Sequence, residues 1–369
     1  MNRGARKELA LVSGLLGLAC LSRRRSGWAA AFALGATALR YWPSNYSFRN
    51  RSVIITGGSR GLGLALAENL LKAGARVALL ARDAEELDRA QAIIEERTGN
   101  GGIFTISCDV TQPAELKRAL EQAEGLFGRI DILVNNAGVI AIGPFETMDR
   151  ADFDALIELQ VHTVVSASQA ILPHFRGGGG GRIVNICSLG GKVAVPHMSS
   201  YCAAKFALAG LSSAMAAELA KDNIVVTTVF PGLMRTGSPI QASIKGDHDK
   251  EFAWFALGDV TPMLSVSADR AARKILAGIR GGEAEVIFPT TAKLAVFAQT
   301  HFPELMALTM QVAARFFPTG LSLERQTGFQ SREFLERLPG YTSLKTVAHK
   351  AEADYNQQEA EDDEVNLGV

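Results

Sequence analysis

Seven short runs of apolar residues recur between residues 53 and 288 of the chain. Most are separated by helix-length stretches with the apolar spacing of an amphipathic helix, such as 62–72, 84–97 and 113–127. Runs that are apolar on both faces and alternate with helices are typical of a parallel sheet covered on both sides. The pattern therefore predicts a doubly wound α/β domain with three layers and about seven strands. The predicted strands are 53–55, 76–80, 103–107, 132–134, 183–186, 224–229 and 285–288.

The first fifty residues differ from this pattern. Two apolar stretches of thirteen residues, Leu9–Leu21 and Gly27–Leu39, flank a basic run that contains Arg23–Arg25. Each stretch is shorter than the roughly 20 residues that a spanning helix needs, and a single tilted span would draw the arginines inward at a cost. We expect a membrane anchor, either a shallow hairpin or an interfacial segment with its arginines among the headgroups. A signal peptide and an arm packed on a partner are the alternatives.

The chain after the last predicted strand has two parts. The segment Lys293–Phe317 is rich in Leu, Met and Phe, and it either packs on the sheet or forms an apolar surface that touches a membrane. The end of the chain is acidic and is expected to be disordered. The predicted organisation is an anchor-like arm over 1–50, the α/β domain over 51–290, apolar helices over 291–340 and an acidic disordered tail over 341–369.

Composition narrows the class of protein. The chain has 369 residues, of which 47% are hydrophobic, which is enough to bury a sizeable core. Lys and Arg together number 38, as do Asp and Glu, so bulk charge does not favour nucleic acid as a partner. Cys20, Cys108, Cys187 and Cys202 show no CxxC spacing. We predict reduced, buried thiols rather than disulfides or a metal site.

A glycine-rich stretch, Thr56-Gly57-Gly58-Ser59-Arg60-Gly61-Leu62-Gly63, follows the first predicted strand and opens the next helix. Glycines at such a junction permit a tight turn, close approach of a pyrophosphate to backbone N–H groups, and close packing of the helix. A glycine cluster alone is a weak signal, because ordinary turns contain one too. Its place between a strand and a helix favours a dinucleotide-binding turn.

The end of the second predicted strand bears on which dinucleotide binds. An NAD-selective site usually offers an acidic side chain there, whereas this chain has Arg82 followed by Asp83. Arg82 is suited to bind a 2′-phosphate, and Arg60 in the glycine-rich turn is close enough to join it. The alternative is that Arg82 is a solvated strand end and that Asp83 only caps the next helix. We expect NADP, with NAD less favoured.

A third group of polar residues follows the fifth predicted strand. Tyr201 and Lys205 are four residues apart, so their side chains project from one face of a helix. Ser188 precedes Tyr201 by thirteen residues. A phenol beside an ammonium group suggests acid/base chemistry, because a nearby cation favours the phenolate.

In order and spacing, these motifs resemble the short-chain dehydrogenase/reductase family over roughly residues 50–290. The resemblance rests on the TGxxxGxG turn, Asp109 after the third strand, the Asn135–Gly138 stretch after the fourth, Ser188, Tyr201-x3-Lys205, and Pro231-Gly232-x3-Thr236. It implies one Rossmann-type domain that both binds the dinucleotide and carries the catalytic residues. It also implies that segment 237–263 forms a variable lid over the site.

The resemblance implies a role for each matched position. Tyr201 would exchange a proton with the substrate oxygen, Lys205 would lower the Tyr201 pKa and hold the nicotinamide ribose, and Ser188 would align the substrate oxygen. Asp109 and Val110 would fix the adenine. The residues implied in cofactor binding are Thr56, Gly57, Ser59, Arg60, Gly61, Leu62, Gly63, Arg82, Asp109, Val110, Asn136, Ala137, Gly138, Tyr201, Lys205, Pro231, Gly232 and Thr236.

One position departs from the family pattern. Gln160 stands where an asparagine usually completes a catalytic tetrad, linking the lysine to a proton path through a main-chain carbonyl and a water. Gln160 either preserves that main-chain contact or shifts the helix bulge and slows proton exchange. His162 is expected to be a surface or packing histidine rather than a proton shuttle.

The function expected is hydride transfer between NADP(H) and a carbonyl or secondary alcohol. If the C-terminal helices touch a membrane, the substrate is a lipophilic ketone such as a long-chain 3-keto lipid, a retinoid or a sterol. The alternative is a nucleotide-binding scaffold or redox-sensing regulator with little turnover. We expect membrane association with the catalytic domain facing the cytosol. The resemblance also implies a homodimer or homotetramer, and the alanine-rich face of the helix of Tyr201 is suited to close packing.

Overall fold

The computed structural model describes residues 12–13, 46–99, 101–261, 264–337 and 342–357. The chain divides into two compact units, Met1–Ser47 and Phe48–Val369. Apart from Val12 and Ser13, the two apolar stretches predicted as an anchor lie outside the described residues. All elements below belong to the second unit.

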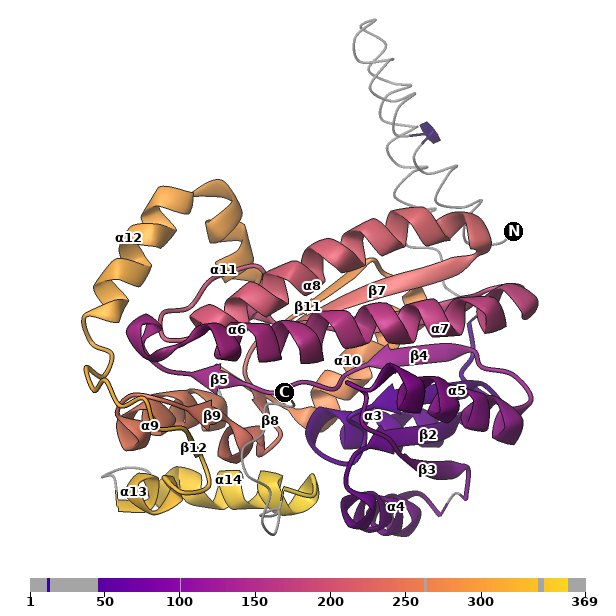
Figure 1. Ribbon diagram of the computed structural model, residues 1–369, viewed down its shortest axis with the longest axis horizontal. Helices are drawn as coiled ribbons and strands as arrows, with labels where there is room; N and C mark the ends of the chain where they lie inside the picture. The colour runs from indigo at the N-terminus through magenta and orange to yellow at the C-terminus, as the bar shows by residue number, and fades with distance from the viewer. Residues whose placement is uncertain (1–11, 14–45, 100, 262–263, 338–341, 358–369) are drawn as a thin grey trace, which may run out of the picture. The chain divides into compact units, whose positions relative to one another are not determined.

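A seven-stranded sheet forms the centre of this unit (Figure 1). Every neighbouring pair of strands is parallel, and all seven predicted strands are present, which confirms the expected fold. The apolar runs are strands because both of their faces are buried; every residue of β1 is inaccessible to solvent or nearly so. Across the sheet the order is β11 (Glu285–Phe288), β7 (Ile224–Pro231), β6 (Gly181–Ile186), β4 (Ile132–Asn135), β1 (Ser52–Thr56), β2 (Arg76–Ala81) and β3 (Ile103–Ser107).

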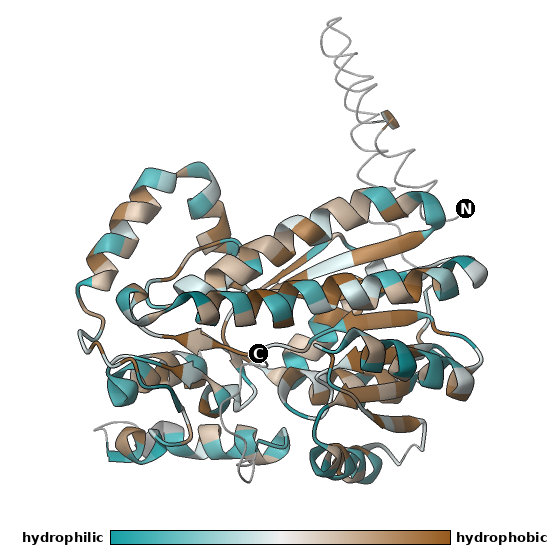
Figure 2. Cartoon of the chain, viewed as in Figure 1, coloured by the Kyte–Doolittle hydropathy of each residue, from teal (hydrophilic) through white to brown (hydrophobic). Residues whose placement is uncertain are grey.

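Helices cover both faces of the sheet. On one face, α3 (Gly61–Lys72) packs between α4 (Ala84–Thr98) and α10 (Ala268–Gly281). On the other face lie α5 (Pro113–Phe127), α7 (Thr163–Gly177) and α8 (Ser199–Glu218). The apolar positions of α5 and α7 join those of the strands in one core cluster, and Figure 2 shows the strands as mainly apolar segments. The chain order reverses between β1 and β4, which creates a crevice at their carboxyl ends.

The helix predicted to contain Gln160 is interrupted. It consists of α6 (Arg150–Ile157), a π-helical turn over Glu158–His162, and α7. Single π-helical turns within α-helices often lie at functional sites. Here the turn places Gln160 under the end of β4, as described below.

A smaller layer lies beyond the carboxyl ends of the strands. It contains β5 (Ala141–Ile142), β9 (Ser243–Ile244) and β12 (Gln326–Thr327), and the separate parallel pair β8 (Met234–Arg235) and β10 (Val266–Ser267). The predicted lid forms helix α9 (His248–Val260), which packs against α13 (Arg332–Arg337) and α14 (Thr342–Asp354). Together these helices bury a second apolar core.

The prediction of a disordered tail is wrong for residues 342–357. They form α14 and a short buried extension, because the acidic residues have cationic partners and the small residues have a core to pack on. Glu352 pairs with Arg332 at 2.5 Å, and Asp354 pairs with Arg97 at 3.6 Å. Ala348 and Ala351 are buried. The rest of the predicted tail lies outside the described residues.

The apolar C-terminal segment forms two helices, α11 (Thr290–His301) and α12 (Pro303–Ala314). Only Ala292 is buried in α11, and no residue of α12 is buried. The expectation that this segment packs on the sheet is therefore wrong for α12. Figures 1 and 2 show the two helices as an arm with apolar segments along it. The exposed large apolar side chains of the arm and the loop after it are Leu294, Phe297, Phe302, Leu305, Leu308, Val312, Phe316, Leu321 and Leu323.

Among the described residues, two helices are long and apolar enough to cross a membrane by length and composition. They are Arg150–Gly177 and Ser199–Asp222. Both cover the central sheet, and α8 packs directly on α6 and β7. Because core helices meet the same criteria, we do not assign either helix to a membrane.

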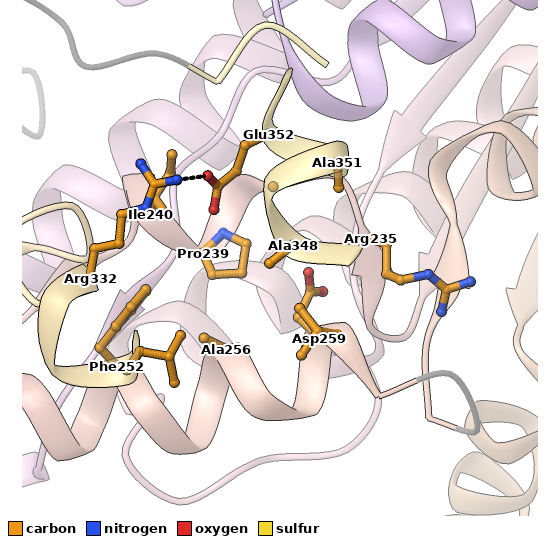
Figure 3. A pocket seen from close by; sticks show the side chains of 13 residues that line it. Arg235, Pro239, Ile240, Phe252, Ala256, Asp259, Arg332, Ala348, Ala351 and Glu352 are labelled. Atoms are coloured by element: carbon orange, nitrogen blue, oxygen red, sulfur yellow. Dashed lines mark hydrogen bonds and ion pairs between the residues drawn. The ribbon is translucent and has the colours of Figure 1, made fainter. Parts of the chain in front are cut away.

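A buried carboxyl lies in a small cavity between α9 and α14 (Figure 3). Asp259, 5% exposed, points from α9 toward α14 and accepts a hydrogen bond from the Met234 N–H at 3.0 Å. Burial raises the pKa of Asp259 from 3.8 to about 7, although the Met234 N–H and the nearby Arg235 act in the opposite direction. The folded state therefore favours the protonated acid.

This raised pKa predicts that stability falls as the pH rises from about 4 to about 7. Between these pH values the carboxyl is ionised in the unfolded chain but still protonated in the native state, so the free energy of unfolding falls as the pH rises. Above about pH 7 the carboxyl is ionised in both states, and the loss of stability stays constant at about 4 kcal/mol. Asp259→Asn, which keeps an oxygen for the Met234 N–H, should raise the free energy of unfolding at pH 8 and change it little at pH 4. Urea denaturation at both pH values measures this, with the exposed Asp249→Asn as control. Equal effects of Asp259→Asn at the two pH values would contradict it.

Candidate active site

The glycine-rich turn joins β1 to α3 with no room for side chains. A Cβ atom on Gly63 would lie 2.2 Å from the Gly57 carbonyl oxygen, and one on Gly57 would lie 2.9 Å from the Ala137 Cα. Gly57 and Gly61 also have φ angles near +60°, which favour glycine. The turn therefore brings its backbone close to the stretch that follows β4, and α3 starts directly after it. These features fit a dinucleotide pyrophosphate.

Asn136 and Thr56 hold this turn against the end of β4. The Asn136 side-chain amide donates to the carbonyl oxygens of Thr56 and Gly57, at 3.1 and 2.7 Å. In return, the Thr56 hydroxyl accepts from the N–H groups of Asn136 and Ala137. Asn135 instead donates to Asn185 in the interior of the sheet. Of the neighbouring asparagines, Asn136 shapes the crevice and Asn135 serves the core.

Sequence reasoning missed Glu86, in the first turn of α4. Its carboxylate accepts a hydrogen bond from the Ser59 hydroxyl and pairs with Arg60 at 3.3 Å. It is 8% exposed. Ser59 and Arg60, which were both implied in cofactor binding, therefore both contact this acid. The sequence offers no signal for it, since an acidic residue near a helix N-terminus is common.

Arg82 and Asp83, at the end of β2, have different surroundings. Asp83 caps α4 by accepting from the Glu86 N–H at 2.9 Å. The Arg82 side chain is exposed, and no ion pair is recorded for it within the described part of the chain. Asp109 lies after β3, where its carboxylate accepts from the Thr111 N–H and hydroxyl. The two ends of β2 and β3 thus present a free cation and an anchored acid side by side.

The stretch Pro231–Thr236 leaves the end of β7. The Gly232 N–H donates to the Phe288 carbonyl oxygen at 2.7 Å, which extends the pairing of β7 with β11. Thr236 is buried, and its hydroxyl donates to Ser238 at 2.8 Å. A Cβ atom on Gly61 would lie 3.8 Å from the Thr236 Cβ, so this stretch borders the glycine-rich turn.

Ser188, Tyr201 and Lys205 come together at the carboxyl end of β6. The Tyr201 Cε1 and the Ser188 Oγ lie 3.2 and 3.4 Å from the position of a Cβ atom on Gly190, so the two side chains are neighbours. The Lys205 Nζ lies 5.7 Å from the centre of the Tyr201 ring and donates to the Ile186 carbonyl oxygen at 3.1 Å. It also lies 3.8 Å from the position of a Cβ atom on Gly138. The predicted catalytic residues therefore adjoin the stretch that follows β4.

Burial dominates the titration of both groups. It raises the pKa of the Tyr201 phenol, although the hydrogen bond with Ser188 acts to lower it. It lowers the pKa of the Lys205 amine from 10.5 to about 8. In the protein alone, Lys205 therefore does not produce the lowered Tyr201 pKa that the sequence suggested, because the loss of solvation is the larger effect.

Gln160 lies in the π-helical turn, 1% exposed, beside the same stretch. Its Nε2 donates to the Val139 carbonyl oxygen at 2.8 Å, and its side-chain carbons approach within 3.7 Å of the Gly138 Cβ position. Its Oε1 is buried without a hydrogen-bond partner among the described residues.

His162 is exposed and bonds Glu158, which confirms a surface histidine. Cys108, Cys187 and Cys202 are free and buried, as predicted, and Cys20 lies outside the described residues.

A second group that sequence reasoning missed lies at the start of α8. His197 has a φ of +61° and contacts the fully buried Glu251 at 2.6 Å, while Glu251 also accepts from the Trp254 indole at 2.7 Å. Phe317, which follows α12, packs on the rings of both His197 and Trp254. This cluster connects the apolar arm to the lid helix and to the residues just before Tyr201.

Comparisons with known proteins agree with this arrangement. The family described as short chain dehydrogenase matches residues 51–246. SadH of Mycobacterium tuberculosis is 31% identical over 278 residues, which cover 74% of this chain and 98% of that protein. The chain belongs to the short-chain dehydrogenase family. It is therefore an NAD(P)-dependent short-chain dehydrogenase/reductase that acts on CH–OH groups.

Solved structures of short-chain dehydrogenases are similar to it over 65–74% of the chain. A short-chain dehydrogenase from Streptomyces avermitilis has a TM-score of 0.62 and 27% identity, and the match covers 74% of this chain and 98% of that one. A metagenomic short-chain oxidoreductase in complex with NADP has a TM-score of 0.52 and 29% identity, with 65% and 97% covered. A 3-ketoacyl-(acyl-carrier-protein) reductase from Brucella melitensis in complex with NADH has a TM-score of 0.54 and 25% identity, and the match covers 65% of this chain and 96% of that one. Relatives of this chain thus bind either dinucleotide.

Proposed function

We propose that this short-chain dehydrogenase reduces a lipophilic ketone with NADPH. The observation that carries the chemistry is the juxtaposition of Ser188, Tyr201 and Lys205 beside the stretch that borders the dinucleotide crevice. The bound dinucleotide supplies the hydride that the carbonyl carbon accepts. The residues that would hold it are the glycine-rich turn, Arg82, Asp109 and the stretch Pro231–Thr236.

Tyr201 is the proton donor in this proposal. The carbonyl oxygen accepts hydrogen bonds from Ser188 and Tyr201, and it takes the Tyr201 proton as the carbon–oxygen double bond becomes a single bond. The raised pKa of Tyr201 supports reduction, because the phenol keeps its proton at neutral pH until the developing alkoxide withdraws it. Lys205, buried next to the ring, then stabilises the phenolate that remains.

Tyr201→Phe tests this assignment. It should lower kcat for a long-chain ketone by about 10²–10⁴-fold, because it removes the proton donor and retains the ring. Binding of NADPH, followed by its fluorescence, should change little. Ser213→Ala, on the exposed side of the same helix, serves as control. Equal rates for Tyr201→Phe and the unaltered enzyme would refute the mechanism, whereas an unaltered chain that binds NADPH without turnover would favour a nucleotide-binding scaffold.

The preference for NADP rests on Arg82. Its exposed guanidinium follows β2, where a 2′-phosphate would lie, and bidentate pairing with phosphate suits arginine. Arg60 contributes less in this arrangement, because Glu86 already pairs with it. Glu86 also places a negative charge near the phosphate, so the preference depends mainly on Arg82.

Arg82→Ala should weaken NADPH binding by about tenfold or more, which corresponds to about 1.4 kcal/mol, and leave NADH binding nearly unchanged. Titration of both dinucleotides against the variant measures the difference. Arg150→Ala removes another exposed cation, at the start of α6, and should affect the binding of neither dinucleotide. An equal loss for NADH and NADPH would show that Arg82 does not contact the 2′-phosphate.

The proposed substrate class rests on the arm formed by α11 and α12. Leu305, Leu308 and Phe316 are each more than half exposed, so water contacts a large apolar surface. Phe317 joins this surface to His197 and Trp254 beside the site. A surface of this kind suits a membrane, from which a lipophilic ketone would reach the lid. We propose independently that the apolar N-terminal stretches anchor the chain, with the catalytic domain facing the reducing, dinucleotide-containing cytosol.

Vesicle sedimentation of the full-length chain tests membrane contact. Leu305→Glu combined with Leu308→Glu should reduce the fraction that pellets with lipid vesicles, because the charges oppose burial of the arm in the interface. Thr309→Glu combined with Gln311→Glu adds the same charge at exposed polar positions of α12 and serves as the matched control. Deletion of residues 1–45 tests the anchor separately. If both double variants pellet equally, the arm does not bind the membrane.

The proposed assembly is a homodimer or homotetramer through α8. The outer side of this helix exposes small residues around Phe206, which is 45% exposed. Ala203, Ala207 and Ala214 belong to that side and permit close approach of a second helix, whereas Ala204 is buried against the domain.

A further inference from the structure

The chain end beyond α14 enters the region where the dinucleotide is expected. Tyr355, Asn356 and Gln357, here called the clasp, follow α14 directly. Asn356 and Gln357 are 3% and 6% exposed, although the sequence around them is polar and acidic. Such burial of polar residues requires specific hydrogen-bond partners.

The first contact of the clasp is with the glycine-rich turn. The Gly61 N–H, at the first position of α3, donates to the Tyr355 carbonyl oxygen at 2.9 Å. No side chain caps this helix N-terminus, so the clasp supplies the acceptor that a capping residue would provide. The clasp thereby holds Gly61, at the junction of the glycine-rich turn and α3, through a backbone hydrogen bond.

The second contact joins two walls of the crevice. The Asn356 side-chain Nδ2 donates to the Ser59 carbonyl oxygen at 3.0 Å and to the Glu86 carbonyl oxygen at 3.1 Å. One amide therefore connects the glycine-rich turn to the start of α4. Asn356 adopts a φ of +55°, a conformation that asparagine tolerates better than most residues.

The third contact reaches the opposite wall. The Gln357 Nε2 donates to the Thr236 carbonyl oxygen at 3.1 Å. The same atom lies 3.2 Å from the position of a Cβ atom on Gly61, so the Gln357 amide fills the gap between the turn and the stretch after β7. The Gln357 Oε1 is buried and has no partner among the described residues. A buried acceptor without a donor is costly, and a ligand that carries hydroxyl groups would provide one.

We propose that the clasp is a part of the dinucleotide site, in which Asn356 and Gln357 are positioning residues that hold the turn, the start of α4 and the Thr236 stretch in their binding arrangement. Among the described residues, no other segment forms hydrogen bonds to all three of these segments, and these bonds are lost without the clasp. The dinucleotide would then have to order them itself, and its affinity would fall. The inference rests on the proposed placement of the dinucleotide at the glycine-rich turn.

Chain-end variants of the full-length protein test this inference. A chain that ends after Asp354 lacks the clasp, whereas one that ends after Gln357 keeps it and serves as the matched control. Calorimetric titration with NADP⁺ and NAD⁺ should show binding at least tenfold weaker for the first chain and unchanged for the second. Both dinucleotides should be affected, because the clasp contacts segments that either would use.

Two isosteric substitutions separate the clasp contacts from general loss of structure. Asn356→Asp and Gln357→Glu place a carboxylate oxygen against the carbonyls that now accept hydrogen bonds, and each should weaken dinucleotide binding. Hydrogen exchange of the peptide that spans residues 56–63 should accelerate in both. Lys350→Ala, exposed on α14, is the control. Thermal unfolding of each variant checks that the domain remains folded.

The outcomes distinguish the two proposals. If the chain that ends after Asp354 binds dinucleotide as tightly as the intact chain, or more tightly, the clasp is dispensable or competes with the ligand, and the inference is wrong. That result leaves the Tyr201 mechanism intact. If the intact chain binds neither dinucleotide, the placement of the site at the glycine-rich turn fails, and the role of the clasp fails with it.

Discussion

The close approach of two strand ends, β1 and β4, is the constraint on which the site depends. Gly57 leaves no space for a Cβ atom beside the Ala137 backbone, and the Asn136 amide joins the two ends with two hydrogen bonds. This approach aims the N-terminus of α3 at the crevice. It also sets the course of the stretch after β4, where Gly138 allows the Lys205 ammonium to come near. Nucleotide binding and proton transfer are thus linked through one backbone contact rather than through separate domains.

Burial determines the electrostatics of the site. Tyr201 and Lys205 have lost solvent, and burial acts on their pKa values in opposite directions, because it disfavours the charged form of each group. A charge brought into this region by a ligand would be poorly screened and would act strongly on both groups. The site is therefore sensitive to what occupies the crevice. Charges on exposed side chains further out, such as Arg82, are screened by solvent.

The sequence predicted the elements whose physics is local. Strands buried on both faces appear as continuous apolar runs, and the Tyr201–Lys205 spacing needs only one helical turn. Glu86 and the clasp could not be predicted in this way, because their roles depend on contacts between segments far apart in the chain; Asn356 and Ser59 are 297 residues apart. The acidic composition of the chain end suggested disorder, but it does not reveal that Arg332 and Arg97 lie opposite its carboxylates. The predicted anchor and the site roles themselves remain predictions.

Helix α8 is used around most of its circumference. One side places Tyr201 and Lys205 at the site, another buries Cys202 and Leu208 in the core, and a third exposes small residues and Phe206 to solvent. A residue change on either of the first two sides would disturb the site or the packing of the core. Evolutionary drift is therefore expected to bypass this helix and to accumulate in the lid and the arm. Related enzymes would then differ in the substrates that they bind and share the same reaction.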